Sequence, residues 1–222
     1  MELYRTVRKQ AEVVQVIEKS RFIAHVCPVE SREEADAFLA EIRSEYKDAT
    51  HNVPAMVIGE KSQIQWASDD GEPQGTSGAP MVQMMVKEGL TNLIVVVTRY
   101  FGGIKLGTGG LVRAYTSSAK LGLEAAGICS VRELAELTVR IDYPHLAKIQ
   151  NMASEQLDLE EADRTGEENF SNFRIADIRY TDRLDMKIQT LPGSVNNVES
   201  LFQNITAGKS EVLSREIVRE KV

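Results

Sequence analysis

The sequence predicts an α+β protein of two domains, and three observations point to this class. Leu93–Thr98 is rich in β-branched residues, as buried strands are, and a helical pattern that ends at about Ala126 follows it. Gly127 marks the end of that helix, which places a domain boundary close behind it. The rest of the chain has the pattern of a β-α-β-β-α-β unit. We therefore expect one domain at residues 1–130 and a second at residues 131–222.

The apolar pattern of the first domain predicts five strands and three helices. Strands are expected at Val13–Val16, Arg21–Val26, Val53–Ile58 and Ile64–Ala67, besides Leu93–Thr98. A helix begins after Ser31, because a serine followed three residues later by a glutamate, here Glu34, is a typical capping box. Two further helices are expected at Met81–Lys87 and from Leu111 to about Ala126. Residues 68–80 hold three glycines and two prolines and therefore predict a loop.

The second domain has a ferredoxin-like pattern. Its expected elements are a strand that ends near Ile141, a helix that begins at Pro144, a hairpin of Phe173–Tyr180 and Leu184–Leu191, a helix after Pro192, and a last strand at Val212–Val218. An acidic stretch at residues 158–169 predicts a loop between the first helix and the hairpin.

Composition indicates a cytoplasmic protein. The longest clean apolar run, Leu93–Val97, is far too short to cross a bilayer, and the first ten residues lack the apolar core of a signal peptide. Cys27 and Cys129 belong to no CxxC motif and to no cluster with metal-ligand spacing, so we expect small buried hydrophobes. We expect no membrane partner, no bound metal and no cofactor, and we favour a monomer.

Charge is distributed unevenly along the chain. The net charge of −7 argues against tight non-specific binding to nucleic acid. However, no acidic residue occurs between Glu88 and Glu124, a window that contains four basic side chains. The chain therefore keeps one locally positive stretch.

The strongest motif lies in that window, where five glycines separate a predicted strand from a predicted helix. Glycine lets backbone amides approach a ligand closely, and a helix N-terminus adds free N–H groups and partial positive charge. The candidate anion-binding residues are Arg99, Gly102, Gly103, Lys105, Gly107, Thr108, Gly109, Gly110 and Arg113. The spacing fits neither a Walker loop nor a dinucleotide fingerprint. The alternative is that the glycines serve only close helix–sheet packing.

Six more polar residues are candidates for a supporting role, namely Lys19, Arg21, His51, Asp69, Asp70 and Glu72. Lys19 and Arg21 lie at an expected strand-to-strand turn. The three carboxylates lie close enough in sequence to hold a hard cation, although a solvated turn is the more common use of such residues. A further alternative is that this acidic loop docks against the basic segment. No pattern assigns a catalytic residue.

Several of these stretches together resemble the signature of the IMPACT/YigZ-like family. They are Glu18–Ile23, Ala49–Asn52, Ser68–Pro73 with Gly75 and Gly78, Arg99–Gly103, Gly107–Leu111 and Arg113–Tyr115. The resemblance covers roughly residues 15–125, and the second domain resembles the C-terminal domain of bacterial members. It implies a βαβ-rich first domain similar to the second domain of a small-subunit ribosomal protein. It also implies a second domain similar to the last domain of elongation factor G.

The resemblance also implies a role. Eukaryotic members regulate translation under nutrient stress by competing for a partner of an eIF-two-alpha kinase, a pathway that bacteria lack. We therefore expect a translation-linked binding protein that contacts RNA, the ribosome or a translation factor through the basic glycine-rich segment. Two alternatives stay open. One is an enzyme or binding protein for a phosphate- or nucleotide-type small molecule, with His51, Asp69, Asp70 and Glu72 as polar groups. The other is a purely structural or protein-interaction role.

Overall fold

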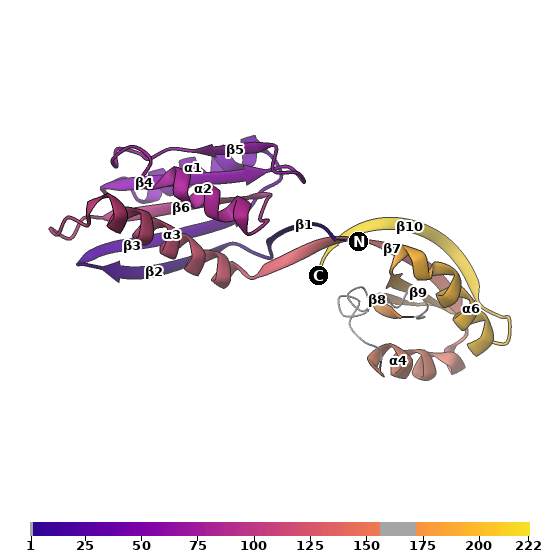
Figure 1. Cartoon of the computed structure of the whole chain (residues 1–222). Helices are drawn as coiled ribbons and strands as arrows, with labels where there is room; N and C mark the ends of the chain where they lie inside the picture. The colour runs from indigo at the N-terminus through magenta and orange to yellow at the C-terminus, as the bar shows by residue number, and fades with distance from the viewer. Residues whose placement is uncertain (1, 156–171) are drawn as a thin grey trace. The chain divides into compact units, whose positions relative to one another are not determined.

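The computed structural model describes residues 2–155 and 172–222 (Figure 1). The expected acidic loop at residues 158–169 lies outside the described residues. The chain divides into two compact units, Leu3–Ser130 (the N-terminal unit) and Val131–Val222 with the first residues of the chain (the C-terminal unit). The division falls within β1 (Glu2–Val7) and β7 (Ile128–Ile141). No helix in the described ranges is both long enough and apolar enough to cross a membrane.

The N-terminal unit is built on one antiparallel sheet with the strand order β2-β3-β6-β4-β5. Its strands are β2 (Ala11–Ile17), β3 (Ser20–Pro28), β4 (His51–Ile58), β5 (Ile64–Ala67) and β6 (Leu93–Tyr100). Each predicted strand is found, and all but β5 extend beyond the predicted ends. The β-branched run of β6 occupies the centre of the sheet, where residues 93–97 have no exposed surface. Such a run is typical of a strand that is buried on both faces.

Helices cover both faces of this sheet. The helix α1 (Arg32–Glu45) packs on one face, while α2 (Gly78–Lys87) and α3 (Gly107–Ala126) pack on the other (Figure 1). The expected cap of α1 is present, because the Ser31 hydroxyl accepts a hydrogen bond of 3.2 Å from the Glu34 amide. Two apolar cores result, one against α1 and one against α2 and α3.

The start of α3 differs from the prediction. The helix begins at Gly107 instead of Leu111, so three glycines expected in a loop lie in its first turn. Glycine is a poor helix former, and local propensity therefore argued for a later start. Tertiary packing overrides it, because Leu111, Ala114 and Tyr115 are buried against the sheet and hold the first turns in place.

The C-terminal unit has the predicted element order, and its strands β7, β8 (Phe173–Tyr180), β9 (Leu184–Thr190) and β10 (Glu211–Lys221) lie in the sheet order β10-β7-β9-β8. Its helices are α4 (Leu146–Glu155) and α6 (Val195–Ile205). Both helices contribute to the core on one face of the sheet. Paired charges lie on the strands as well, with Arg140 joined to Asp185 at 2.7 Å and Lys187 to Glu136 at 2.9 Å.

Candidate functional site

The start of α3 carries backbone donors that the helix itself does not use. The first four N–H groups of any α-helix have no partner within the helix, and they carry its partial positive charge. In α3 these groups include the N–H groups of residues 107–109, the N-cap residue Leu106 makes no side-chain cap bond, and the first turn holds no acidic residue. The turn therefore presents several donors and a positive field without an internal acceptor.

Packing accounts for some of the glycines in this segment but not for all of them. A Cβ on Gly102 would lie 2.0 Å from the carbonyl carbon and oxygen of Lys19, so the β2–β3 turn requires a glycine there. Gly103 and Gly107 have φ of +86° and +69°, which other residues rarely adopt. Gly109 has neither constraint, because its φ is not positive and a Cβ would meet nothing within 4 Å. The fold does not explain Gly109.

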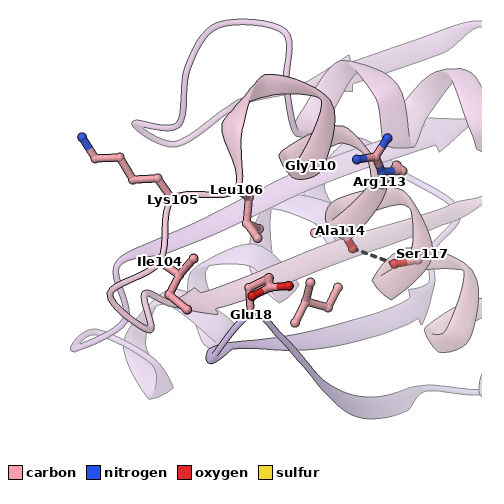
Figure 2. A pocket seen from close by; sticks show the side chains of 9 residues that line it. Glu18, Ile104, Lys105, Leu106, Gly110, Arg113, Ala114 and Ser117 are labelled. Carbon is pink, nitrogen blue, oxygen red and sulfur yellow. Dashed lines mark hydrogen bonds between the residues drawn. The ribbon is translucent and has the colours of Figure 1, made fainter.

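Two hollows flank the segment that leads into α3. The first, which we call the α3 cleft, has a volume of about 380 Å³ and is lined by Glu72, Pro73, Arg99, Phe101, Lys105, Leu106, Gly107, Thr108 and Leu111. The second, the hairpin hollow, has a volume of about 470 Å³ and is lined by Ile17, Glu18, Ile104, Lys105, Leu106, Gly110, Arg113, Ala114 and Ser117. Figure 2 shows Lys105 extending outward from the loop before α3 and Arg113 projecting from the helix itself.

A buried polar network forms the inner end of the α3 cleft. One oxygen of Glu72, Oε1, accepts hydrogen bonds from Arg99 Nη1 at 2.6 Å and from the Tyr115 hydroxyl at 2.8 Å. His51 Nε2 lies 3.7 Å from the same oxygen. Burial, together with the nearby Glu72 charge, raises the pKa of Tyr115, so its hydroxyl stays protonated and donates to Glu72. The positive charge of Arg99 is thus balanced inside the protein.

The β2–β3 turn joins this network through Ser20. The Ser20 hydroxyl accepts from Arg99 Nη2 at 3.3 Å and from the Gly102 amide at 3.2 Å. Together with the close approach of Gly102 to Lys19, these bonds fix the turn against the glycine-rich segment. Arg99 therefore positions neighbouring backbone in addition to pairing with Glu72.

Asp69 and Asp70 organise the segment between β5 and α2, residues 68–77, which we call the acidic loop. The Asp69 carboxylate accepts from the amides of Gly75, Ser77 and Gly78 and from the Ser77 hydroxyl at 2.6 Å. Partial burial acts to raise the pKa of Asp69, but these hydrogen bonds outweigh it and lower the pKa.

Asp70 instead accepts from the Asn52 amide at 2.6 Å and pairs with Arg43 at 2.9 Å. His51 Nδ1 lies 2.7 Å from the Asp70 carbonyl oxygen, which ties β4 to the same loop. No group of three or more His, Cys, Asp or Glu residues within the described ranges could hold a metal ion.

The four remaining candidate cations do not all lie together. Lys105 and Arg113 are exposed on the two hollows and make no ion pair with any residue that the structure describes. Lys19 is exposed at the β2–β3 turn. Arg21 stacks on the Tyr100 ring, 4.4 Å from its centroid, and its place in β3 puts it on the face that carries α1. The structure thus separates Arg21 from the start of α3.

Three residues that shape the site, namely Ser20, Phe101 and Tyr115, were not predicted from the sequence. Tyr115 carried a usable signal, because a tyrosine on the inner face of a helix needs a buried partner for its hydroxyl. Phe101 is 47% exposed although it is a large apolar side chain. Its position beside the α3 cleft depends on the path of the loop, which no local pattern predicts.

Comparison with known proteins identifies the family. The Impact N-terminal domain family matches residues 18–123. The IMPACT family member YvyE of Bacillus subtilis (strain 168) is 38% identical over 214 residues, which is 96% of this chain and 92% of the relative. The chain belongs to the IMPACT family. The resemblance found in the sequence is thereby confirmed.

Other relatives agree. The IMPACT family member YigZ of Escherichia coli (strain K12) is 41% identical over 140 residues, covering 62% of this chain and 69% of the relative. Protein IMPACT of Mus musculus is 36% identical over 94 residues, covering 40% of this chain and 29% of the relative. A solved crystal structure of a hypothetical protein is 31% identical, with a TM-score of 0.57 over 97% of this chain and 98% of that one. The matched domain includes all candidate IMPACT site residues, from Lys19 to Arg113.

Proposed function

We propose that this IMPACT family member is a translation-linked regulatory protein whose N-terminal unit binds RNA through phosphates held at the start of α3. The observation that carries the proposal is the uncapped first turn of α3 beside two exposed, unpaired cations of the described chain, Lys105 and Arg113. A helix N-terminus with backbone donors and a positive field is suited to phosphate. Gly109 supports this interpretation, since a glycine that the fold does not require leaves room for close approach of a ligand.

The link to translation comes from the family. Regulation of translation is the expectation attached to the eukaryotic members, and the chain shares their N-terminal domain. The local charge fits an RNA partner better than the net charge of −7 does, because the acid-free window lies at this site. Among the described residues that line the hairpin hollow, only Glu18 on the β2–β3 turn brings a carboxylate.

Arg99 has a supporting role in this proposal. Because Glu72 balances its charge at 2.6 Å, its guanidinium holds the β2–β3 turn and the acidic loop in place and does not bind a phosphate. The alternative in which Asp70 acts as an acid–base group and Asp69 holds a cation receives no support, since backbone amides and Arg43 occupy both carboxylates.

A salt titration of RNA binding tests the proposal. The purified chain and the variant Lys105→Ala/Arg113→Ala are titrated with a single-stranded RNA at several salt concentrations, and cosedimentation with ribosomes is compared. The matched control is Lys47→Ala/Lys61→Ala, which removes two exposed lysines elsewhere on the N-terminal unit. We expect the first variant to bind more weakly and its salt slope to fall by about 0.7 for each phosphate that it no longer neutralises. Equal affinity and equal slope in the two variants would overturn the proposal.

A further inference from the structure

The α3 cleft has walls of two chemical kinds. Lys105 and the first helical residues Gly107 and Thr108 form a positive, donor-rich end. Phe101, Leu106 and Leu111 supply an apolar wall. The volume of about 380 Å³ falls in the range of about 300–1,000 Å³ that is typical of small-molecule sites. The cleft therefore has room for an apolar body attached to an anionic group.

Glu72 presents an unused acceptor in this cleft. Its side chain is only 4% exposed, and its three close polar neighbours, Arg99, Tyr115 and His51, all lie on Oε1. Among the described residues Oε2 has no hydrogen-bond partner, and Glu72 lines the cleft. A ligand with an N–H donor would complete this set of bonds.

Phe101 adds a stacking surface to the same cleft. Its ring is 47% exposed, and the Arg99 guanidinium lies 5.5 Å from its centroid. An exposed aromatic ring beside a guanidinium is a platform on which unstacked bases are bound in RNA-binding proteins.

We infer that the α3 cleft binds a nucleoside phosphate, with a purine base that carries N–H donors stacked on Phe101 and hydrogen-bonded to Glu72 Oε2. The phosphate then lies at the first turn of α3 beside Lys105. Guanine fits best, because it combines a flat apolar body with adjacent N–H donors on one edge. This inference rests on the proposed function and deepens it, since the nucleoside phosphate is either part of an RNA strand or a free nucleotide.

Calorimetric titration of the full chain with a graded set of ligands tests the base site. The ligands are GMP, purine riboside 5′-monophosphate (whose base has no N–H donor), ribose 5-phosphate and inorganic phosphate. We expect GMP to bind about tenfold more tightly than ribose 5-phosphate, in line with the strength of base–aromatic stacking. The affinity for purine riboside 5′-monophosphate is expected to lie between the affinities for GMP and ribose 5-phosphate. Equal affinity for GMP and ribose 5-phosphate would overturn the inference.

Two variants test whether the preference for GMP arises in the α3 cleft. Phe101→Ala removes an exposed ring and is expected to abolish the preference for GMP while affinity for inorganic phosphate is kept. Tyr180→Ala is the matched control, because Tyr180 is an exposed aromatic residue of the C-terminal unit, 60% exposed. A GMP preference that survives Phe101→Ala would contradict the inference.

A final comparison separates this inference from the proposed function. The RNA nonamers U9 and U4GU4 are titrated into the wild-type chain. Tighter binding of U4GU4 than of U9 supports both the base site and the RNA proposal. GMP binding that depends on Phe101, without binding of either strand, supports the base site for a free nucleotide and sinks the RNA proposal. RNA binding with no base preference and no effect of Phe101→Ala sinks the base site and leaves the RNA proposal standing.

Discussion

Glu72 Oε1 lies 2.6 Å from Arg99 Nη1, and 4% and 6% of the two side chains are exposed. This pair joins the acidic loop at residues 68–77 to the central strand β6, so the loop docks against the basic segment at a buried ion pair. Because the two charges balance each other, Lys105 and Arg113 are the cations left for a ligand at the start of α3. The positive character of the site therefore comes from exposed side chains and backbone amides.

Loss of Glu72 is expected to destabilise the N-terminal unit strongly. Glu72→Ala leaves the Arg99 guanidinium and the Tyr115 hydroxyl buried without their acceptor. Breaking a buried ion pair in this way costs about 3–5 kcal/mol of unfolding free energy. Urea unfolding followed by fluorescence measures this loss of unfolding free energy, because Trp66, the single tryptophan of the chain, lies in β5 of this unit. The control Glu41→Ala on exposed α1 surface should change stability by less than about 0.5 kcal/mol; equal midpoints for the two variants would contradict the assignment.

Two glycine substitutions should act in opposite directions. Gly102→Ala places a Cβ 2.0 Å from the Lys19 carbonyl, and we expect a loss of about 1–3 kcal/mol. Gly109→Ala places a Cβ in open space within a helix, and we expect a gain of about 0.5–1 kcal/mol. The same urea unfolding assay compares them. If Gly109→Ala proved as destabilising as Gly102→Ala, Gly109 would have a structural role that the packing does not reveal.

Asp69 should make the N-terminal unit sensitive to strong acid. Hydrogen bonds lower its pKa below the ordinary value of 3.8, so the folded state binds this proton less readily than the unfolded chain. The stability that Asp69 contributes is therefore present above pH 3.8 and is lost as pH falls through the lowered pKa. Asp69→Asn should cost about 1–3 kcal/mol at neutral pH, and its deficit relative to wild type should shrink as pH falls below about 4. A deficit that stays constant with pH would show that the charge has no part in it.

The sequence predicted those features that depend on local pattern, namely the strands of the N-terminal sheet, the cap at Ser31 and the element order of the C-terminal unit. It placed the start of α3 too late, because the propensity of Gly107, Gly109 and Gly110 opposes the helix that buried packing enforces. It selected Arg99 and Glu72 separately but not their pairing. That pairing depends on how a loop folds back over β6, and no periodicity in the sequence encodes such a path.

His25 should couple stability to mild acidification. Its ring is 3% exposed, with Nε2 3.2 Å from the Thr98 hydroxyl and Nδ1 3.2 Å from Glu12. Burial lowers the pKa of His25 below 6.5 and outweighs the attraction of Glu12 and Glu45, which act to raise it.

A lowered pKa means that the unfolded chain takes up the His25 proton first, so stability is full above pH 6.5 and declines as pH falls below it. The decline reaches at most about 1.4 kcal/mol per pH unit. Unfolding midpoints from Trp66 fluorescence at about pH 7.5 and pH 5.5 should therefore fall further in wild type than in His25→Gln. A wild-type chain that gained stability relative to His25→Gln on acidification would mean that the Glu12 attraction dominates over burial.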